Sequence, residues 1–196
     1  MYNELLDKIR QNINSKLSGL KETLYYHSAA HTFDVAKQAV RIAAAENIAN
    51  ERDIFLLNVA ALYHDTGFLF TYKGHEEKSC EIFTEDAPMY SLSQGDISIV
   101  CSIILATKIP QLPATKLEEI ICDADLDYLG REDFAEISNK LRLEFIAYSI
   151  IKNNEEFELM QFKFLTQHQF FTATSVRERN LLKQQHLADI MESLPG

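Results

Sequence analysis

Residues 50–67 read NERDIFLLNVAALYHDTG, a segment that begins and ends like a helix. Asn50 can cap the first turn, and Gly67 stands just past the last. The spacing predicts a helix over about 51–65 with one apolar, inward-facing side. That side comprises Ile54, Leu57, Ala60, Ala61 and His64.

The same helical periodicity continues on both sides of this segment, and no stretch alternates as a strand would. The sequence therefore predicts an all-α protein. Further helices are expected over about 3–18 and 28–46, from near His75, after Ser93, from Thr115 and, as two or three more, over 131–193. Pro110 and Pro113 must interrupt the chain before the helix at Thr115, because proline cannot continue a helix. Nothing marks a linker, so we treat residues 1–196 as a single domain.

The composition narrows the partners and the compartment. The 196 residues carry a formal net charge of −10 and include three cysteines. An acidic chain argues against a nucleic-acid polymer and an anionic membrane surface as partners. An odd number of cysteines without a C-x-x-C pair argues against a disulfide framework. No apolar run is long enough for a membrane span, and the N-terminus lacks a signal-peptide pattern, so we expect a cytoplasmic protein.

Polar side chains interrupt the apolar faces of three expected helices. His64 and Asp65 come at the end of the helix over 51–65, and His31 lies on the inward side of an earlier helix. Asp125 lies near the edge of the apolar face of a later one. A single such histidine is more often a satisfied core residue than a ligand. Together, two imidazoles and two carboxylates from three helices suit a divalent first-row metal ion.

Three aspartates compete for the last of these positions. By helical angle, Asp125 and Asp127 lie about equally far from the apolar face on opposite sides, and Asp123 lies farther out. Helical geometry alone therefore leaves Asp125 and Asp127 as alternatives.

Four stretches carry these residues, and their order and spacing resemble the HD phosphohydrolase superfamily. They are YYHSAAHTFDVAKQAV (25–40), LLNVAALYHDTGF (56–68), GHEEKSCEIF (74–83) and IICDADLDYLG (120–130). The resemblance covers about residues 25–130 and implies a helical bundle of the HD-domain type, with residues 131–196 as a C-terminal helical extension. It also implies a divalent cation (Mn, Fe, Co, Ni, Zn or Mg). The ligands that it implies are His31, His64, Asp65 and Asp125.

Members of the superfamily that bind two metals need additional histidines. His75 matches one such position, whereas the segment ILATKIP has Thr107 and Lys108 where the other is expected. The sequence therefore favours one ion over two, with His75 beside the substrate.

The resemblance implies a metal-dependent phosphatase or phosphodiesterase that acts on a nucleotide or a related small phosphoester through a metal-activated water. Asp65 and His75 are the candidate catalytic residues. The candidate substrate-binding residues are His27, His75, Lys108 and Arg177. The aromatic residues Phe157, Phe162, Phe164, Phe170 and Phe171 are interpreted as core. The expected partners are a small phosphorylated molecule and, as the sequence allows, a second copy of the chain.

Two other functions fit the same residues. Some proteins of this fold carry a di-iron centre and use oxygen, and the absence of a histidine at Thr107 counts against that alternative. The third hypothesis is a non-catalytic ligand-binding or regulatory module with a structural metal. The intact ligand set argues against it, since each charged inward residue destabilises a core without metal.

Overall fold

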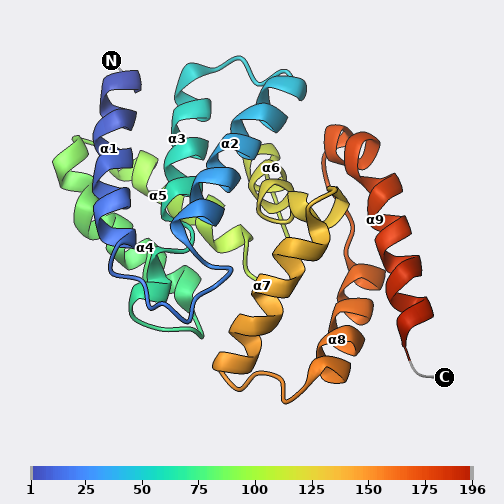
Figure 1. Cartoon of the computed structure of the whole chain (residues 1–196). Coiled ribbons are helices and arrows are strands. Elements are labelled where there is room, and N and C mark those ends of the chain that lie inside the picture. Colours follow the sequence, from blue (N-terminus) through green and yellow to red (C-terminus); the bar gives the residue numbers. More distant parts are fainter. Residues whose placement is uncertain (1, 195–196) are drawn as a thin grey trace.

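The computed structural model describes residues 2–194, and over these residues the chain is helical and contains no strand (Figure 1). The all-α prediction is confirmed. The α-helices are α1 (Tyr2–Leu17), α2 (Ala29–Ala45), α3 (Glu51–Tyr63), α4 (His75–Asp86), α5 (Gln94–Ala106), α6 (Lys116–Asp125), α7 (Phe134–Ala147), α8 (Asn154–Gln167) and α9 (Ala173–Ser193). Short 3-10 helices follow α3, α4 and α6: η1 (Thr66–Leu69), η2 (Ala87–Tyr90) and η3 (Asp127–Gly130). None of the described helices is long and apolar enough to cross a membrane.

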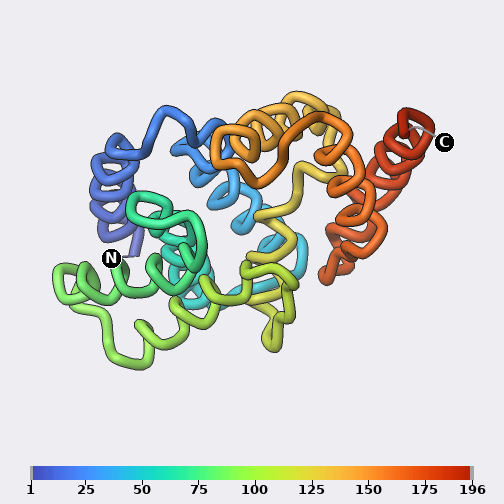
Figure 2. Tube along the Cα trace, turned by 90° about the horizontal axis from the view of Figure 1, so that it is seen from below, coloured from blue at the N-terminus to red at the C-terminus, as the bar shows by residue number. Residues whose placement is uncertain are grey.

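The centre of the larger hydrophobic core is α3, with α1, α2, α4, α5 and α6 packed around it (Figures 1 and 2). Every residue from Phe55 to Tyr63 is buried, Asn58 included. The prediction that only one side of this helix is buried was therefore wrong, because all of its sides are buried from Phe55 onward. A helix that is apolar on all sides needs neighbours on all sides, and the surrounding helices supply them.

A second, smaller core joins η3 to α7, α8 and α9, which lie together on the other side of the molecule (Figure 1). Here α9 lies directly against η3: a Cβ added to Gly130 would come within 2.3 Å of the Arg179 carbonyl oxygen. The buried Asp127 carboxylate accepts hydrogen bonds of 2.8 Å from Arg41 of α2 and from Arg179 of α9. The C-terminal helices are thereby fixed to the helices that precede them.

The predicted caps are present. The Asn50 side chain accepts from two backbone N–H groups at the start of α3, and capping boxes open α5 at Ser93 and α6 at Thr115. However, α3 ends at Tyr63, two residues earlier than expected. Gly67 does not end the helix through a left-handed conformation. It lets α4 approach η1, since a Cβ there would lie 2.0 Å from the His75 backbone oxygen.

The close approach at Gly67 predicts a large loss of stability on Gly67→Ala. The added methyl group overlaps backbone that cannot move without shifting α4, so we expect the free energy of unfolding to fall by about 2 kcal/mol or more. Gly95→Ala is the matched control, because Gly95 lies in the first turn of α5 with only a side-chain atom at 3.7 Å. Urea unfolding measures both variants. Equal stabilities would contradict the packing described.

His168 predicts an acid-sensitive contribution to stability. Its ring packs beside Phe164 and Phe170, and neither ring nitrogen has a hydrogen-bond partner within residues 2–194. Burial, followed by the nearby Lys183 charge, lowers the pKa of His168 to about 3. The unfolded chain therefore gains a proton near pH 6.5 that the folded chain does not. Folding stability should fall below that pH by up to about 1.4 kcal/mol per pH unit.

The variant His168→Leu places an apolar side chain beside the rings of Phe164 and Phe170 and removes the imidazole that titrates. We expect its free energy of unfolding, measured in urea from pH 4.5 to 7.5, to change less with pH than that of the parent protein. Identical pH slopes would show that His168 is protonated equally in both states.

Candidate metal centre

Three helix ends position four polar side chains at one point. His31 is in the first turn of α2, where the Ser28 side chain caps the helix by accepting from the His31 backbone N–H. His64 and Asp65 directly follow the buried helix α3, and Asp125 is the last residue of α6. The ends of α2, α3 and α6 thus bring together residues that lie far apart in the sequence.

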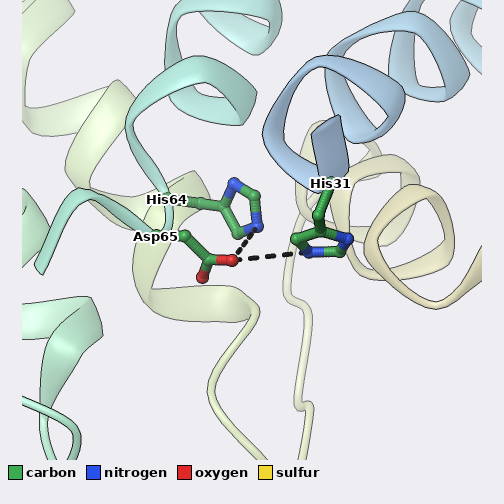
Figure 3. Close-up of side chains that lie close together, drawn as sticks. All are labelled: His31, His64 and Asp65. Atoms are coloured by element: carbon green, nitrogen blue, oxygen red, sulfur yellow. Dashed lines mark ion pairs between the residues drawn. The ribbon is translucent and has the colours of Figure 1, made fainter. Parts of the chain in front are cut away.

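The side chains of these four residues lie close together. The Asp65 Oδ2 atom lies 3.4 Å from His31 Nε2 and 3.2 Å from His64 Nε2 (Figure 3). The Asp125 Oδ1 atom lies 3.1 and 3.5 Å from the same two nitrogens. One ligand atom each from His31, His64 and Asp65 falls within 4.8 Å of the other two. The structure therefore brings together all four residues that the sequence singled out as ligands.

The unpaired atoms of this cluster fit a cation. The Nδ1 atom of His64 lies 2.8 Å from the Ala61 carbonyl oxygen and donates to it, so Nε2 of the neutral ring carries a lone pair. His64 Nε2 and Asp65 Oδ2 are buried, and neither has a hydrogen-bond partner in the described part of the chain. Buried polar atoms without partners are costly. A bound cation would satisfy both, so the residues present fit a divalent metal ion.

Electrostatics of the cluster support the same conclusion. Burial alone would lower the pKa of His31, but the hydrogen bond to Asp125 and the negative charges of Asp125 and Asp65 raise it to about 9. Burial opposes charge on His64 too, yet the same two carboxylates raise its pKa well above the usual value. The two imidazoles in turn overcome burial and lower the pKa values of Asp65 and Asp125. The site favours positive charge, which protons or a divalent cation can supply.

The structure gives the three neighbouring aspartates different roles. Asp123 accepts from the Thr172 backbone N–H at 2.8 Å and from its hydroxyl at 2.6 Å, at the start of α9. Asp127 pairs with Arg41 and Arg179, as described above. Only Asp125 faces the imidazoles among the three, which resolves the choice that helical geometry left open.

A cavity of about 340 Å³ adjoins the cluster, and both further histidines line it. His75, the first residue of α4, has Nε2 at 3.6 Å from Asp65 Oδ1. His27 lies in the loop before α2. The Phe68 ring stacks on both imidazoles, with centroid distances of 4.0 Å to His27 and 3.9 Å to His75. The structure thus places His27 and His75 beside the cluster, next to a space that a substrate can occupy.

Glu144 of α7 is a site residue that the sequence analysis missed. It is buried and accepts from the backbone N–H groups of Tyr26 and His27, the Tyr72 hydroxyl and the His27 Nδ1 atom. Burial would raise the pKa of Glu144, but the bonds from His27 and Tyr26 lower it. The carboxylate therefore fixes the His27 ring with Nδ1 toward Glu144. The one available signal was an acid within the otherwise apolar segment LEFIA at 143–147.

The structure does not bring Lys108 and Arg177 to the cavity. The Lys108 side chain is 52% exposed and pairs with Glu77. The Arg177 side chain is 64% exposed and lies 3.2 Å from Glu178. Each cation therefore has a carboxylate partner at the surface, and we leave both out of the site.

The aromatic residues of the C-terminal region divide between core and cavity. Phe170 is buried in the second core, as expected, and Phe171 is partly exposed. Phe157 and Phe164 also line the cavity beside the metal centre. Interpreting the whole set as core was therefore incomplete, because α8 lines the cavity as well as packing against α9.

Comparison with known proteins identifies the family. The sequence pattern of the HD domain family matches residues 28–127, about half of the chain. The protein belongs to the HD-domain family. The predicted relationship to this superfamily of metal-dependent phosphohydrolases is confirmed, and the His/His/Asp cluster lies within the matched residues. No curated protein and no solved structure matches the chain. His27 and Glu144 of this HD-domain protein lie outside the matched residues.

Proposed function

We propose that this HD-domain protein is a metal-dependent phosphatase or phosphodiesterase acting on a nucleotide or a related small phosphoester. The observation that carries the proposal is the convergence of His31, His64, Asp65 and Asp125 beside a cavity. A divalent cation held by these residues would supply hydroxide near neutral pH and offset charge on the phosphoryl oxygens. Thr107 stands where the resemblance expects the further histidine of a two-metal site, so we propose one cation.

Asp65 has two tasks in this mechanism. Its Oδ2 atom faces the two imidazoles and serves as a ligand, whereas Oδ1 faces His75 and the cavity. The second oxygen can accept a hydrogen bond from the attacking water and orient it in line with the leaving oxygen. His75, on the same side, can donate a hydrogen bond to the phosphate.

His27 is the proton donor that we assign to the leaving oxygen. Glu144 accepts from Nδ1, so in the imidazolium form of the ring Nε2 carries the second proton, which it can give to the leaving oxygen in the cavity. Two backbone N–H bonds and the Tyr72 hydroxyl hold Glu144 itself. Glu144 is thus a positioning residue that acts through His27.

The proposed positioning role predicts the behaviour of Glu144→Gln. The amide keeps the shape of the side chain but loses the charge, so we expect kcat to fall by about 10–100-fold with a smaller change in KM. Phenyl phosphate, with its poor leaving group, should lose more than p-nitrophenyl phosphate. Glu136→Gln, on the exposed face of α7, is the matched control. Equal losses for both esters would assign Glu144 a purely structural role.

A hydrolysis screen tests the function as a whole. The protein, stripped with chelator and reloaded with Mn²⁺, Fe²⁺, Co²⁺, Ni²⁺, Zn²⁺ or Mg²⁺, is assayed against phosphomonoesters, phosphodiesters and nucleotides. We expect turnover that depends on the cation. Binding of phosphoesters without turnover under any of these ions would favour a non-catalytic module instead.

A further inference from the structure

The lining of the cavity contains two kinds of side chain. Asp65, His75 and Asp125 contribute polar groups that belong to the metal centre or adjoin it. A group of apolar side chains comes from α7 and α8, outside the residues matched by the family. They are Leu141, Phe145, Phe157, Met160 and Phe164. The HD core thus supplies the chemistry, and the C-terminal helices supply the surface that the rest of a substrate meets.

The charges around the cavity limit a substrate to one phosphoryl group. No lysine or arginine within residues 2–194 lines the cavity, whereas Asp65, Glu76 and Asp125 do. Lys108 lies nearby in sequence but is paired with Glu77 at the surface. A second or third phosphate would therefore meet a carboxylate or an apolar wall, and a buried charge without a partner is costly.

Two polar side chains of the cavity, Gln161 and Thr107, already have partners within the protein. The Gln161 amide donates to the buried Ser138 hydroxyl, and the Thr107 hydroxyl donates to the Ile104 carbonyl. Hydroxyl groups of a sugar would compete with these bonds for partners. An apolar body needs none and gains from leaving water.

The cavity has a volume of about 340 Å³, within the range usual for small-molecule sites, so an aromatic ring system or a short alkyl chain fits within it. The rings of Phe145 and Phe157, with centroids 6.2 Å apart, offer flat apolar surface.

We propose that the substrate is a phosphoester with a single phosphoryl group on a small, uncharged apolar body, and that α7 and α8 bind this body. The substrate class rests on the proposed function. The apolar subsite does not, because its walls are present whatever reaction the protein performs.

Binding of an uncharged probe tests the subsite without any reaction. The metal-free protein is titrated with 1-naphthol, followed by its fluorescence, and with adenosine as the polar comparison. We expect saturable binding of 1-naphthol, at least about tenfold tighter than that of adenosine. Met160→Asp should weaken 1-naphthol binding by about tenfold or more, because it places a charge in the subsite. Leu159→Asp is the matched control, since both side chains are exposed on α8 (46% for Leu159, 39% for Met160) and only Met160 lines the cavity.

Hydrolysis by the metal-loaded protein then separates the two proposals. We expect kcat/KM for 1-naphthyl phosphate to exceed that for AMP by about tenfold and that for ATP by more. Tighter binding of adenosine than of 1-naphthol, or preference for AMP or ATP, overturns this inference and leaves the phosphohydrolase standing. Binding of 1-naphthol that depends on Met160, without hydrolysis of any ester, supports the subsite and overturns the proposed function.

Discussion

Replacing His64 with alanine should abolish cation-dependent hydrolysis, with a loss in kcat/KM of about 10³-fold or more. His64 is 1% exposed, and its Nε2 atom lies 3.2 Å from Asp65 and 3.5 Å from Asp125, so the substitution removes one ligand from the middle of the buried cluster. A cation contributes several kcal/mol of charge stabilisation in phosphoryl transfer, and each 1.36 kcal/mol is a factor of ten in rate. Initial rates over a range of cation concentrations measure the effect.

Because His64 is buried, a loss of activity could also reflect a loss of folding. Asp125→Asn separates the two causes, since the amide keeps the shape of the carboxylate but is a far weaker ligand. Asp133→Asn is the matched control: its carboxylate pairs with Arg131 and is 42% exposed. Circular dichroism should show native helix content in all three variants. Wild-type rates in folded His64→Ala and Asp125→Asn would contradict the metal centre.

The second large effect is expected at His27. Loss of a general acid costs about 10²–10⁴-fold, so His27→Gln should reduce kcat by this order for phenyl phosphate. The loss should be much smaller for p-nitrophenyl phosphate, whose leaving group departs without a proton. Cation binding should be unchanged, because His27 is not a ligand. Stopped assays with both esters, together with a calorimetric cation titration, measure these three quantities.

The control for His27→Gln is His186→Gln. His186 lies on α9 and bonds to the Arg131 carbonyl, away from the cavity, and we expect this variant to keep the wild-type rate. Equal losses for the two esters in His27→Gln would assign the residue to substrate binding instead. A loss of cation affinity would make it part of the metal centre.

Much of the fold could be predicted because its determinants are local. The caps at Asn50, Ser93 and Thr115 each join residues two or three positions apart, and the structure shows all of them. The metal cluster could be predicted because its members break apolar faces at helix ends, and a family resemblance selected Asp125 over its neighbours. The structure explains that selection, since Asp123 and Asp127 hold α9 in place.

The remaining features depend on contacts between distant segments. Glu144 reaches His27 across 117 positions, and the apolar wall of the cavity comes from two helices that the sequence left unassigned. The sequence analysis named Lys108 as a candidate for binding phosphate. The sequence does not distinguish that role from the surface ion pair with Glu77 that the structure shows. Helical periodicity says which side of a helix is buried. It does not say which partner or cavity that side meets.

The most direct test of the central claim is a crystal structure of the protein grown with Mn²⁺, with diffraction recorded on both sides of the manganese absorption edge. The account predicts an anomalous peak within ligation distance of His31 Nε2, His64 Nε2 and carboxylate oxygens of Asp65 and Asp125. Manganese bound elsewhere at full occupancy, with these four side chains bonded only to one another, would contradict it.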